Sequence, residues 1–435
     1  MARNSFVVLM ADVPRAATAN QRPCRLSSSR RLWRVVAIAG LLAGLLVAPP
    51  SQAGDVAFQQ WLWATWPQAR ALGVSRATFD AAVRGLEPDY SLPDLDIPGR
   101  PEQASPQPEF VQTPAQYLRE ATFDRLAAQG RRLAAEYRPV LARIEREIGV
   151  PGNLVLAIWA RESGYAREFH GRDALRVLAT QGFAGRRKDF FRNEFLYALK
   201  LIEDGIPRSD LRSSWGGAMG LTQFLPSEFY KYAVDFDGDG KADIWHSVPD
   251  ALASAARQLK GKGWRSGEPW AIEVHPPGSV DCTIAEPSRM MPIGAWLEQG
   301  YVPAYHRRIP PPLHAIEASL LLPEGTYGPA FLTPKNYYVL KDYNYSDLYV
   351  LFVGHLADRI GGGRPFETPW SKNAQLRTAD VAFLQQRLAA LGFYHDKIDG
   401  KAGMLTRAAL GLYQKANGLK VDCWPTEDVL ARMRR

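Results

Sequence analysis

The spacing of hydrophobic residues predicts helices along much of the chain. From Ala115 to about Gly263, apolar residues recur every three to four positions, as in Tyr117 to Ile148 and Phe190 to Ile202. Phe58 to Leu86 predicts two shorter helices, separated by a glycine stop and a serine N-cap at Leu72-Gly73-Val74-Ser75. We therefore expect a mainly α-helical body.

The pattern changes outside this body. Pro93 to Pro114 is rich in proline and predicts an extended connection. Between Trp264 and Pro334, prolines separate short apolar segments without a helical period, which predicts a small β-containing insertion. A helix is expected again from about Ser346 to Ile360, where three glycines end it. Arg364 to Arg377 is polar and predicts a linker.

The end of the chain predicts a separate three-helix module. Val381, Leu384 and Leu388 recur at helical spacing. A tight turn follows at Ile398-Asp399-Gly400, and a second helix ends at Asn417-Gly418. A segment of this size can fold alone.

The first 53 residues predict an export signal. A run of 14 residues, 35–48, contains only Val, Ala, Ile, Leu and Gly, follows arginines and leads to Ser51-Gln52-Ala53. This pattern is typical of cleavage after Ala53, which would release the protein into the periplasm. A membrane anchor is the alternative, although the run is shorter than the roughly 20 residues that span a bilayer.

Charge and cysteine content narrow the function further. The formal net charge is +8, but seven arginines and one aspartate lie in residues 1–53, so their removal leaves +2. A nearly balanced mature chain lacks the basic face that nucleic-acid binding requires. Cys24 lies in the leader, and Cys282 and Cys423 have no metal-binding spacing. An oxidising compartment would permit a bridge between them, but nothing in the sequence requires one.

Glu162 is the strongest candidate for an acid catalyst. It follows Leu154 to Ala160, seven consecutive apolar residues that predict a helix buried nearly all round. Glu162 comes four positions after Ile158, so it lies on a buried side. Burial should raise its pKa, so that it can hold a proton near neutral pH. An ion pair with Arg161 or Arg167 is the alternative.

A glycine-rich segment from Ser213 to Ser227 is the second candidate part of a site. Its small residues allow the backbone to approach a ligand closely. Ser214, Trp215 and Gln223 could supply hydrogen bonds and a ring face to that ligand. A glycine-rich packing turn is the alternative.

Three motifs together resemble the membrane-bound lytic murein transglycosylase B family. They are Glu162-Ser163-Gly164, the run from Gly217-Ala218-Met219-Gly220 to Gln223-Phe224, and Tyr343-Asn344-x-Ser346-x-x-Tyr349. The resemblance extends over roughly Phe58 to Ile360. It implies a lysozyme-like helical fold and cleavage, without water, of the β-1,4 bond between N-acetylmuramic acid and N-acetylglucosamine in peptidoglycan.

The resemblance also implies roles for single residues. Glu162 would first protonate the leaving oxygen and then, as a base, take the proton from the muramoyl C6 hydroxyl, which closes a 1,6-anhydro ring. A sugar acetamide would replace the second carboxylate of ordinary glycosidases, and no cofactor is required. Ser214 and Gln223 would bind near that sugar, and Tyr343 would shape the cleft. The substrate-binding residues expected are Ser214, Trp215, Gln223, Tyr343, Asn344 and Tyr349.

The segment from Asp235 to His246 resembles an EF-hand calcium loop, which the related family also carries. The metal-binding residues expected are Asp235, Asp237, Asp239, Lys241 and Asp243. His246 stands where calcium normally receives a bidentate acidic ligand. We therefore expect weak or structural Ca²⁺ binding, with a cation-free polar turn as the alternative.

The end of the chain resembles the widespread three-helix peptidoglycan-binding domain. Ile398-Asp399-Gly400, Thr406 and Tyr413-Gln414 belong to that pattern. Where that family often has Asp-Gly, this chain has Asp422-Cys423, so the sequence does not decide the conformation of this loop. Tethering such a binder would raise the concentration of catalyst at the wall. A purely structural appendage is the alternative.

The sequence therefore predicts a signal peptide (1–53), a lytic transglycosylase domain (54–363), a linker (364–377) and a peptidoglycan-binding domain (378–435). Peptidoglycan glycan strands are the expected partner, and this function also allows contacts with proteins of cell-wall synthesis or remodelling. One rival is a hydrolytic muramidase with Glu168 or Asp173 as a second carboxylate, and the other is a non-catalytic peptidoglycan-binding protein. Motifs of serine hydrolases, nucleotide-dependent enzymes and zinc peptidases are absent from the sequence.

Overall fold

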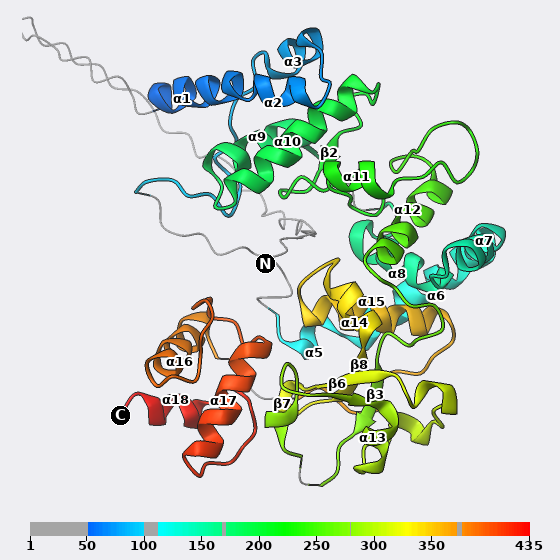
Figure 1. The fold of residues 1–435 in the computed structure, drawn as a ribbon, viewed down its shortest axis with the longest axis vertical. Coiled ribbons are helices and arrows are strands. Elements are labelled where there is room, and N and C mark those ends of the chain that lie inside the picture. The colour runs from blue at the N-terminus through cyan, green and yellow to red at the C-terminus, as the bar shows by residue number, and fades with distance from the viewer. Residues whose placement is uncertain (1–50, 100–111, 168–170, 279, 372–375) are drawn as a thin grey trace, which may run out of the picture.

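The computed structural model describes residues 51–99, 112–167, 171–278, 280–371 and 376–435. Figure 1 shows a mainly helical molecule, with the N-terminal helices at one end and a sheet and the C-terminal helices at the other. The predicted signal peptide lies outside the described residues, apart from the start of the first helix. Among the helices described, none combines the length and the apolar character that crossing a bilayer requires.

The N-terminal layer packs three helices onto two others. These are α1 (Ser51–Ala64), α2 (Trp66–Ala71) and α3 (Arg76–Val83) on α9 (Ala174–Ala184) and α10 (Lys188–Glu203). Two helices were predicted before Leu86, but the structure has three, because Pro67 in the first turn of α2 starts a new helix. The predicted cap is confirmed, since the Ser75 side chain accepts from the Thr78 N–H. The core between these helices contains Phe58, Phe79, Phe191 and Phe195.

The central layer surrounds α8. Its helices are α5 (Pro114–Tyr117), α6 (Glu120–Glu136), α7 (Arg138–Ile148), α8 (Gly152–Ser163), α11 (Pro226–Tyr232), α12 (Val248–Gly261), α14 (Lys335–Lys341) and α15 (Asp347–Ile360). Helix α8 packs against α6, α7, α12 and α15, and nearly all of its residues are buried. This confirms the prediction of a helix that is buried nearly all round.

The predicted β-containing insertion is confirmed as a five-stranded antiparallel sheet in the order β4-β6-β8-β3-β5. Its strands are β3 (Ile272–His275), β4 (Met290–Pro292), β5 (Val302–Pro303), β6 (Glu317–Leu321) and β8 (Ala330–Pro334), with β7 (Pro323–Thr326) and α13 (Ile293–Glu298) nearby. Leu332 of β8 lies opposite both Ile272 and Leu320, so apolar side chains line one face. Strand β8 leads directly into α14, so the sheet anchors the segment that carries Tyr343 and Tyr349.

Residues 376–435, called the C-terminal module here, form three helices with their own core. They are α16 (Thr378–Ala390), α17 (Met404–Ala416) and α18 (Glu427–Met433). A disulfide joins Cys423 of the module to Cys282 of the insertion, which decides the pairing that the sequence left open. Cys423 has a φ of 55°, so it adopts the left-handed conformation that glycine favours in the Asp-Gly form of this loop.

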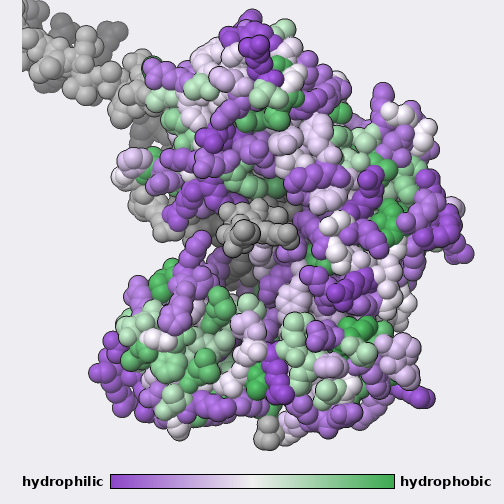
Figure 2. All heavy atoms as spheres, viewed as in Figure 1, coloured by the Kyte–Doolittle hydropathy of each residue, from purple (hydrophilic) through white to green (hydrophobic). Residues whose placement is uncertain are grey.

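The predicted linker packs against the body in its first half. The Phe366 ring stacks on His355 with centroids 3.7 Å apart, and Trp370 stacks on Phe331. The Glu273 carboxylate accepts the backbone N–H groups of two linker residues. The C-terminal module is therefore docked, not loosely tethered. Figure 2 shows a notch in the surface between this module and the N-terminal layer.

Candidate active site

Glu162 lies in the last turn of α8, and its residue is only 3% exposed. The helix ends because Gly164 adopts a left-handed conformation with a φ of 57°. Tyr165 and Ala166 continue in that region with φ values of 60° and 64°, which side-chain-bearing residues rarely adopt. The predicted burial of Glu162 is confirmed, and the chain turns sharply just after it.

Two tyrosines from the α14–α15 segment cover this carboxylate. The Tyr349 hydroxyl donates a hydrogen bond of 2.5 Å to Oε1 of Glu162. The Tyr343 ring lies parallel to that of Tyr349, with centroids 6.4 Å apart and an interplanar angle of 6°. Burial, followed by the negative charge of Glu162, raises the pKa of both hydroxyls well above the usual value. Both tyrosines therefore keep their protons and can donate hydrogen bonds.

The glycine-rich loop is tied to the same place by two hydrogen bonds. Ser163, next to Glu162, donates from Oγ to the Leu221 carbonyl over 2.8 Å. The Tyr343 hydroxyl donates to the Thr222 carbonyl over 2.6 Å. The structure thus brings together the three segments that carry the sequence motifs.

Glycine is required at two positions of this loop. Gly217 and Gly220 have φ values of 82° and 75°. A Cβ on Gly217 would lie 2.2 Å from the Leu178 side chain, and a Cβ on Gly220 would lie 2.7 Å from the Ile244 carbonyl oxygen. The loop therefore packs tightly, as the alternative of a glycine-rich packing turn expects. Close approach of a ligand to its backbone stays a prediction.

Three buried polar atoms of the loop have no hydrogen-bond partner among the residues that the structure describes: Ser213 Oγ, Trp215 Nε1 and Gln223 Oε1. The Gln223 amide is oriented by donating from Nε2 to the Gly220 carbonyl over 3.0 Å. An unsatisfied buried polar group costs about 1–3 kcal/mol, so a polar ligand would relieve that cost. Trp215 and Gln223 are predicted binding residues, and Ser213 is a further candidate, because the sequence does not distinguish its hydroxyl from that of Ser214.

Two other predicted binding residues have partners within the chain. The Ser214 hydroxyl accepts from the Ala218 N–H over 3.3 Å. The Asn344 side chain accepts from the Ser346 N–H over 3.0 Å, which shapes the turn before α15. These contacts fix backbone near the site, and the substrate-binding roles of Ser214 and Asn344 stay predictions.

Asp173, a candidate second carboxylate, already has structural partners. It belongs to β1 (Arg172–Asp173), which pairs with β2 (Arg212–Ser213). Its side chain caps α9 by accepting from the Arg176 N–H, and it forms an ion pair of 2.8 Å with Arg208. Glu168, the other candidate, lies outside the described residues.

The EF-hand-like loop gathers carboxylates in a different combination from the predicted one. Oxygens of Asp235, Asp237 and Asp250 lie within 4.8 Å of one another. Asp250 belongs to α12 and is a further candidate that the sequence did not offer, because it lies beyond the twelve-residue loop. Asp239 and Asp243 lie outside this group and accept backbone N–H groups of their own loop, as Asp235 and Asp237 also do.

Oxygen donors such as these fit Ca²⁺. Asp250 approaches the loop from α12 and accepts the N–H groups of Phe236 and Asp243 over 2.8 and 2.9 Å. It thus supplies an acidic group that His246 cannot. The contribution of the Lys241 carbonyl stays a prediction.

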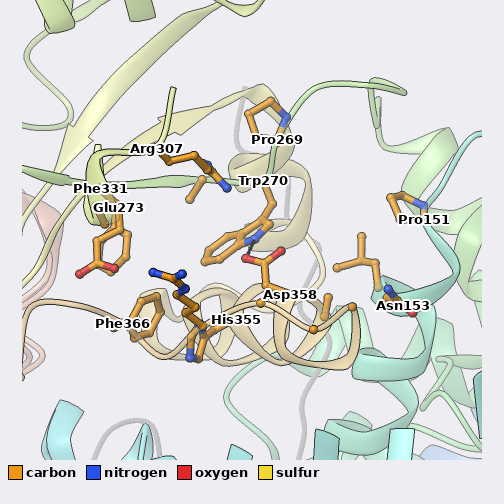
Figure 3. Close-up of a pocket in the computed structure, with 18 of the residues that line it drawn as sticks. Pro151, Asn153, Pro269, Trp270, Glu273, Arg307, Phe331, His355, Asp358 and Phe366 are labelled. Atoms are coloured by element: carbon orange, nitrogen blue, oxygen red, sulfur yellow. Dashed lines mark hydrogen bonds between the residues drawn. The ribbon is translucent and has the colours of Figure 1, made fainter. Parts of the chain in front are cut away.

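A separate cavity of about 740 Å³ lies at the opposite ends of α8 and α15. Figure 3 shows the Trp270 indole above the Asp358 carboxylate, to which it donates a hydrogen bond of 3.0 Å, while Asn153 lies at the far side. Burial raises the pKa of Asp358. Glu162 comes nine positions after Asn153 along α8, a rise of about 14 Å at 1.5 Å per residue, so this cavity is distinct from the candidate active site.

A buried carboxylate at a helix end, covered by two tyrosines and a glycine-rich loop, places this mainly helical protein in the lysozyme-like class. Residues 57–358 match the family described as Transglycosylase SLT domain, and residues 377–433 match a peptidoglycan binding domain. The chain belongs to the transglycosylase SLT domain family.

Individual relatives agree with this assignment. The chain is similar to SltB3 from Pseudomonas aeruginosa, crystallised in complex with NAG-anhNAM-pentapeptide, with a TM-score of 0.79 and 38% identity over 87% of this chain and 99% of that one. It is also similar to the soluble lytic transglycosylase SltB1 from Pseudomonas aeruginosa, with a TM-score of 0.55 and 27% identity over 70% of this chain and 98% of that one.

A curated relative matches over a shorter stretch. Membrane-bound lytic murein transglycosylase B from Escherichia coli (strain K12) is 30% identical over 234 residues. The match covers 53% of this chain and spans 62% of the length of that relative.

Proposed function

We propose that this protein is a lytic transglycosylase that cleaves the β-1,4 bond between N-acetylmuramic acid and N-acetylglucosamine in peptidoglycan. The observation that carries the proposal is the buried Glu162, hydrogen-bonded by Tyr349, in a chain of the transglycosylase SLT domain family. The complex of SltB3 with NAG-anhNAM-pentapeptide supports a 1,6-anhydromuramoyl product.

The chemistry needs one carboxylate and no water. Glu162 donates its proton to the glycosidic oxygen, so that N-acetylglucosamine leaves as an alcohol, while the muramoyl acetamide supports the charge on C1. The ionised Glu162 then takes the proton from the C6 hydroxyl as the C6 oxygen bonds to C1. Glu162 ends protonated, ready for another cycle. The structural partners of Asp173 favour this course over hydrolysis with Asp173 as a second carboxylate.

The glycine-rich loop carries groups that fit a saccharide. Trp215 Nε1, Gln223 Oε1 and Ser213 Oγ are polar atoms that a sugar with hydroxyl and acetamide groups can satisfy. Tyr349 would orient Glu162, and Tyr343 would hold the loop through the Thr222 carbonyl.

The remaining features fit an exported wall enzyme. The C-terminal module would bind peptidoglycan and retain the catalyst there, and the leader would direct the protein to the periplasm. A structural Ca²⁺ would be held by Asp235, Asp237 and Asp250, where it would rigidify the loop beside α12. Nothing in the proposed chemistry depends on that cation.

Digestion of purified peptidoglycan tests the reaction, with the products read by mass spectrometry. We expect anhydromuropeptides from the wild-type chain, none from Glu162→Gln, and near wild-type yields from Asp173→Asn. Reducing-end products that disappear in Asp173→Asn would make the protein a hydrolytic muramidase. No products from the wild-type chain, with binding to the wall retained, would make it a binding protein.

A further inference from the structure

Arg407 of the C-terminal module reaches into the catalytic body. Its Nη2 group lies 3.1 Å from Oδ2 of Asp347, the first residue of α15, and 3.3 Å from Oε1 of Glu286 in the insertion. Lys341 of α14 lies 2.5 Å from the other oxygen of Asp347. We call these four residues the ion network. All of them are largely buried, with side-chain exposures of 2–17%.

The ion network is balanced only when the module contributes its charge. Two carboxylates and two cations sum to zero, whereas without Arg407 Asp347 and Glu286 share one lysine. Burial and the nearby charge of Asp347 already raise the pKa of Glu286. A buried charge that loses its partner forces its surroundings to rearrange.

That rearrangement would move the α14–α15 segment, which carries the tyrosine that binds Glu162. Asp347 comes two positions before Tyr349, and its Oδ1 also accepts from the Tyr337 hydroxyl over 2.9 Å. Lys341 and Asp347 therefore clamp both ends of the short loop that carries Tyr343. The ion network fixes the start of α15, and α15 fixes the hydroxyl that binds Glu162.

We propose that Arg407 is a positioning residue for the active site, so that the docked C-terminal module sets the rate of glycosidic cleavage as well as binding the wall. The proposal rests on the proposed lytic transglycosylase activity. Arg407 is 8% exposed and acts through Asp347 and Tyr349, not by touching the substrate.

Kinetics on a soluble substrate separates positioning from wall binding. The substrate is a tetrasaccharide of alternating N-acetylglucosamine and N-acetylmuramic acid with its stem peptides, cleaved by the full chain. For Arg407→Met we expect kcat to fall about tenfold or more, because small misplacements of catalytic groups cost that much. KM should stay within about twofold, and the fraction bound to sedimented peptidoglycan should not change.

Two further variants distinguish positioning from loss of docking. Adding Glu286→Gln to Arg407→Met restores the charge balance and should recover most of kcat. Lys415→Met breaks a different contact between module and body, the 2.7 Å pair with Asp281, without touching the ion network. It should retain wild-type kcat.

Each outcome decides the proposal. Wild-type kcat in Arg407→Met, an equal loss in Lys415→Met, or no recovery in the double variant would overturn it. If Arg407→Met does not fold, as judged by its melting curve, Arg407→Gln replaces it, because glutamine is polar but uncharged and so also leaves Asp347 and Glu286 to share one lysine. Wild-type kcat in Arg407→Gln would then overturn the proposal. Absence of cleavage by the wild-type chain would instead refute the proposed function.

Discussion

At the scale of single residues, tyrosine hydroxyls hold the parts of the site in place. Tyr349 donates to Glu162, whereas Tyr343 donates to the loop at Thr222. The rings are fully buried and parallel, so a phenylalanine would fill either space. The two hydroxyls can therefore be removed one at a time.

We expect Tyr349→Phe to lower kcat on the soluble tetrasaccharide by about tenfold to a hundredfold with little change in KM, because Glu162 loses the donor that orients it. Tyr343→Phe is the matched control and should cause a smaller loss, because its hydroxyl binds a backbone carbonyl. Steady-state kinetics of both variants checks this. Equal losses would show that the hydroxyl on Glu162 has no special effect.

Residues whose signals are local could be predicted from the sequence. Glu162 follows an uninterrupted apolar run, and burial of that run carries Glu162 inside. Contacts with an opposite segment could not be predicted in this way. Asp250 approaches the loop from α12, and the hydroxyl of Ser213 is seen to be unsatisfied only in the fold, so both are candidates that the structure adds. Spacing within one segment does not contain that information.

At the scale of elements, the stability of the first turn of α15 depends on the negative charge of Asp347. Burial alone would raise the pKa of Asp347, but the positive charges of Lys341 and Arg407 hold it well below its usual range. A carboxyl with a depressed pKa stabilises the fold fully above its unfolded pKa of about 3.9. That stabilisation is lost as pH falls through the folded pKa.

Asp347→Asn should therefore lower the melting temperature near neutral pH, and the difference from wild type should shrink as the pH falls below about 4. Melting curves recorded from pH 7 down into the acid range test this. A difference that stays constant through that range would contradict a depressed pKa for Asp347.

The EF-hand-like loop and α12 form the second element-scale test. If Asp235, Asp237 and Asp250 hold Ca²⁺, saturating calcium should raise the melting temperature, with about 2.7 kcal/mol of stabilisation at a hundred times Kd. Asp250→Asn should remove the calcium-dependent shift. Asp239→Asn, which changes a carboxylate outside this group, should keep most of it. An unchanged shift in Asp250→Asn would exclude Asp250 as a ligand.

The elements themselves were largely predictable, but their docking was not. Helical spacing located the helices around Glu162, and short apolar segments located the sheet. The linker composition is polar on average, which concealed the two rings, Phe366 and Trp370, that pack onto the body. Their partners, His355 and Phe331, belong to α15 and β8, so only the fold reveals these contacts.

At the scale of the whole molecule, covalent and polar contacts join the C-terminal module to the insertion. The disulfide from Cys282 to Cys423 spans 141 residues of sequence. Beside it, the Thr326 N–H donates to the Asp422 carbonyl over 3.0 Å, and the Tyr327 hydroxyl donates to the Asp422 side chain over 2.7 Å. The loop at Asp422 is thus held from both sides.

Removing the disulfide should destabilise the protein by about 2–5 kcal/mol, because the bond restricts a long loop in the unfolded chain. Denaturant titrations of Cys282→Ser measure the loss. Cys423→Gly should lose less, because glycine accepts the φ of 55° at this position without strain. The reverse order would show that the backbone at Cys423 is not under strain.

The docked module also changes what a wall-binding domain can do for its enzyme. A binding domain on a flexible linker lets the active site sample many positions around each site where the domain binds. Here the disulfide, the ion network and the packed linker instead fix the distance between the C-terminal module and the candidate active site. We therefore expect the protein to cut each glycan strand at a constant distance from the site where the module binds, so that the released fragments have a narrow distribution of lengths.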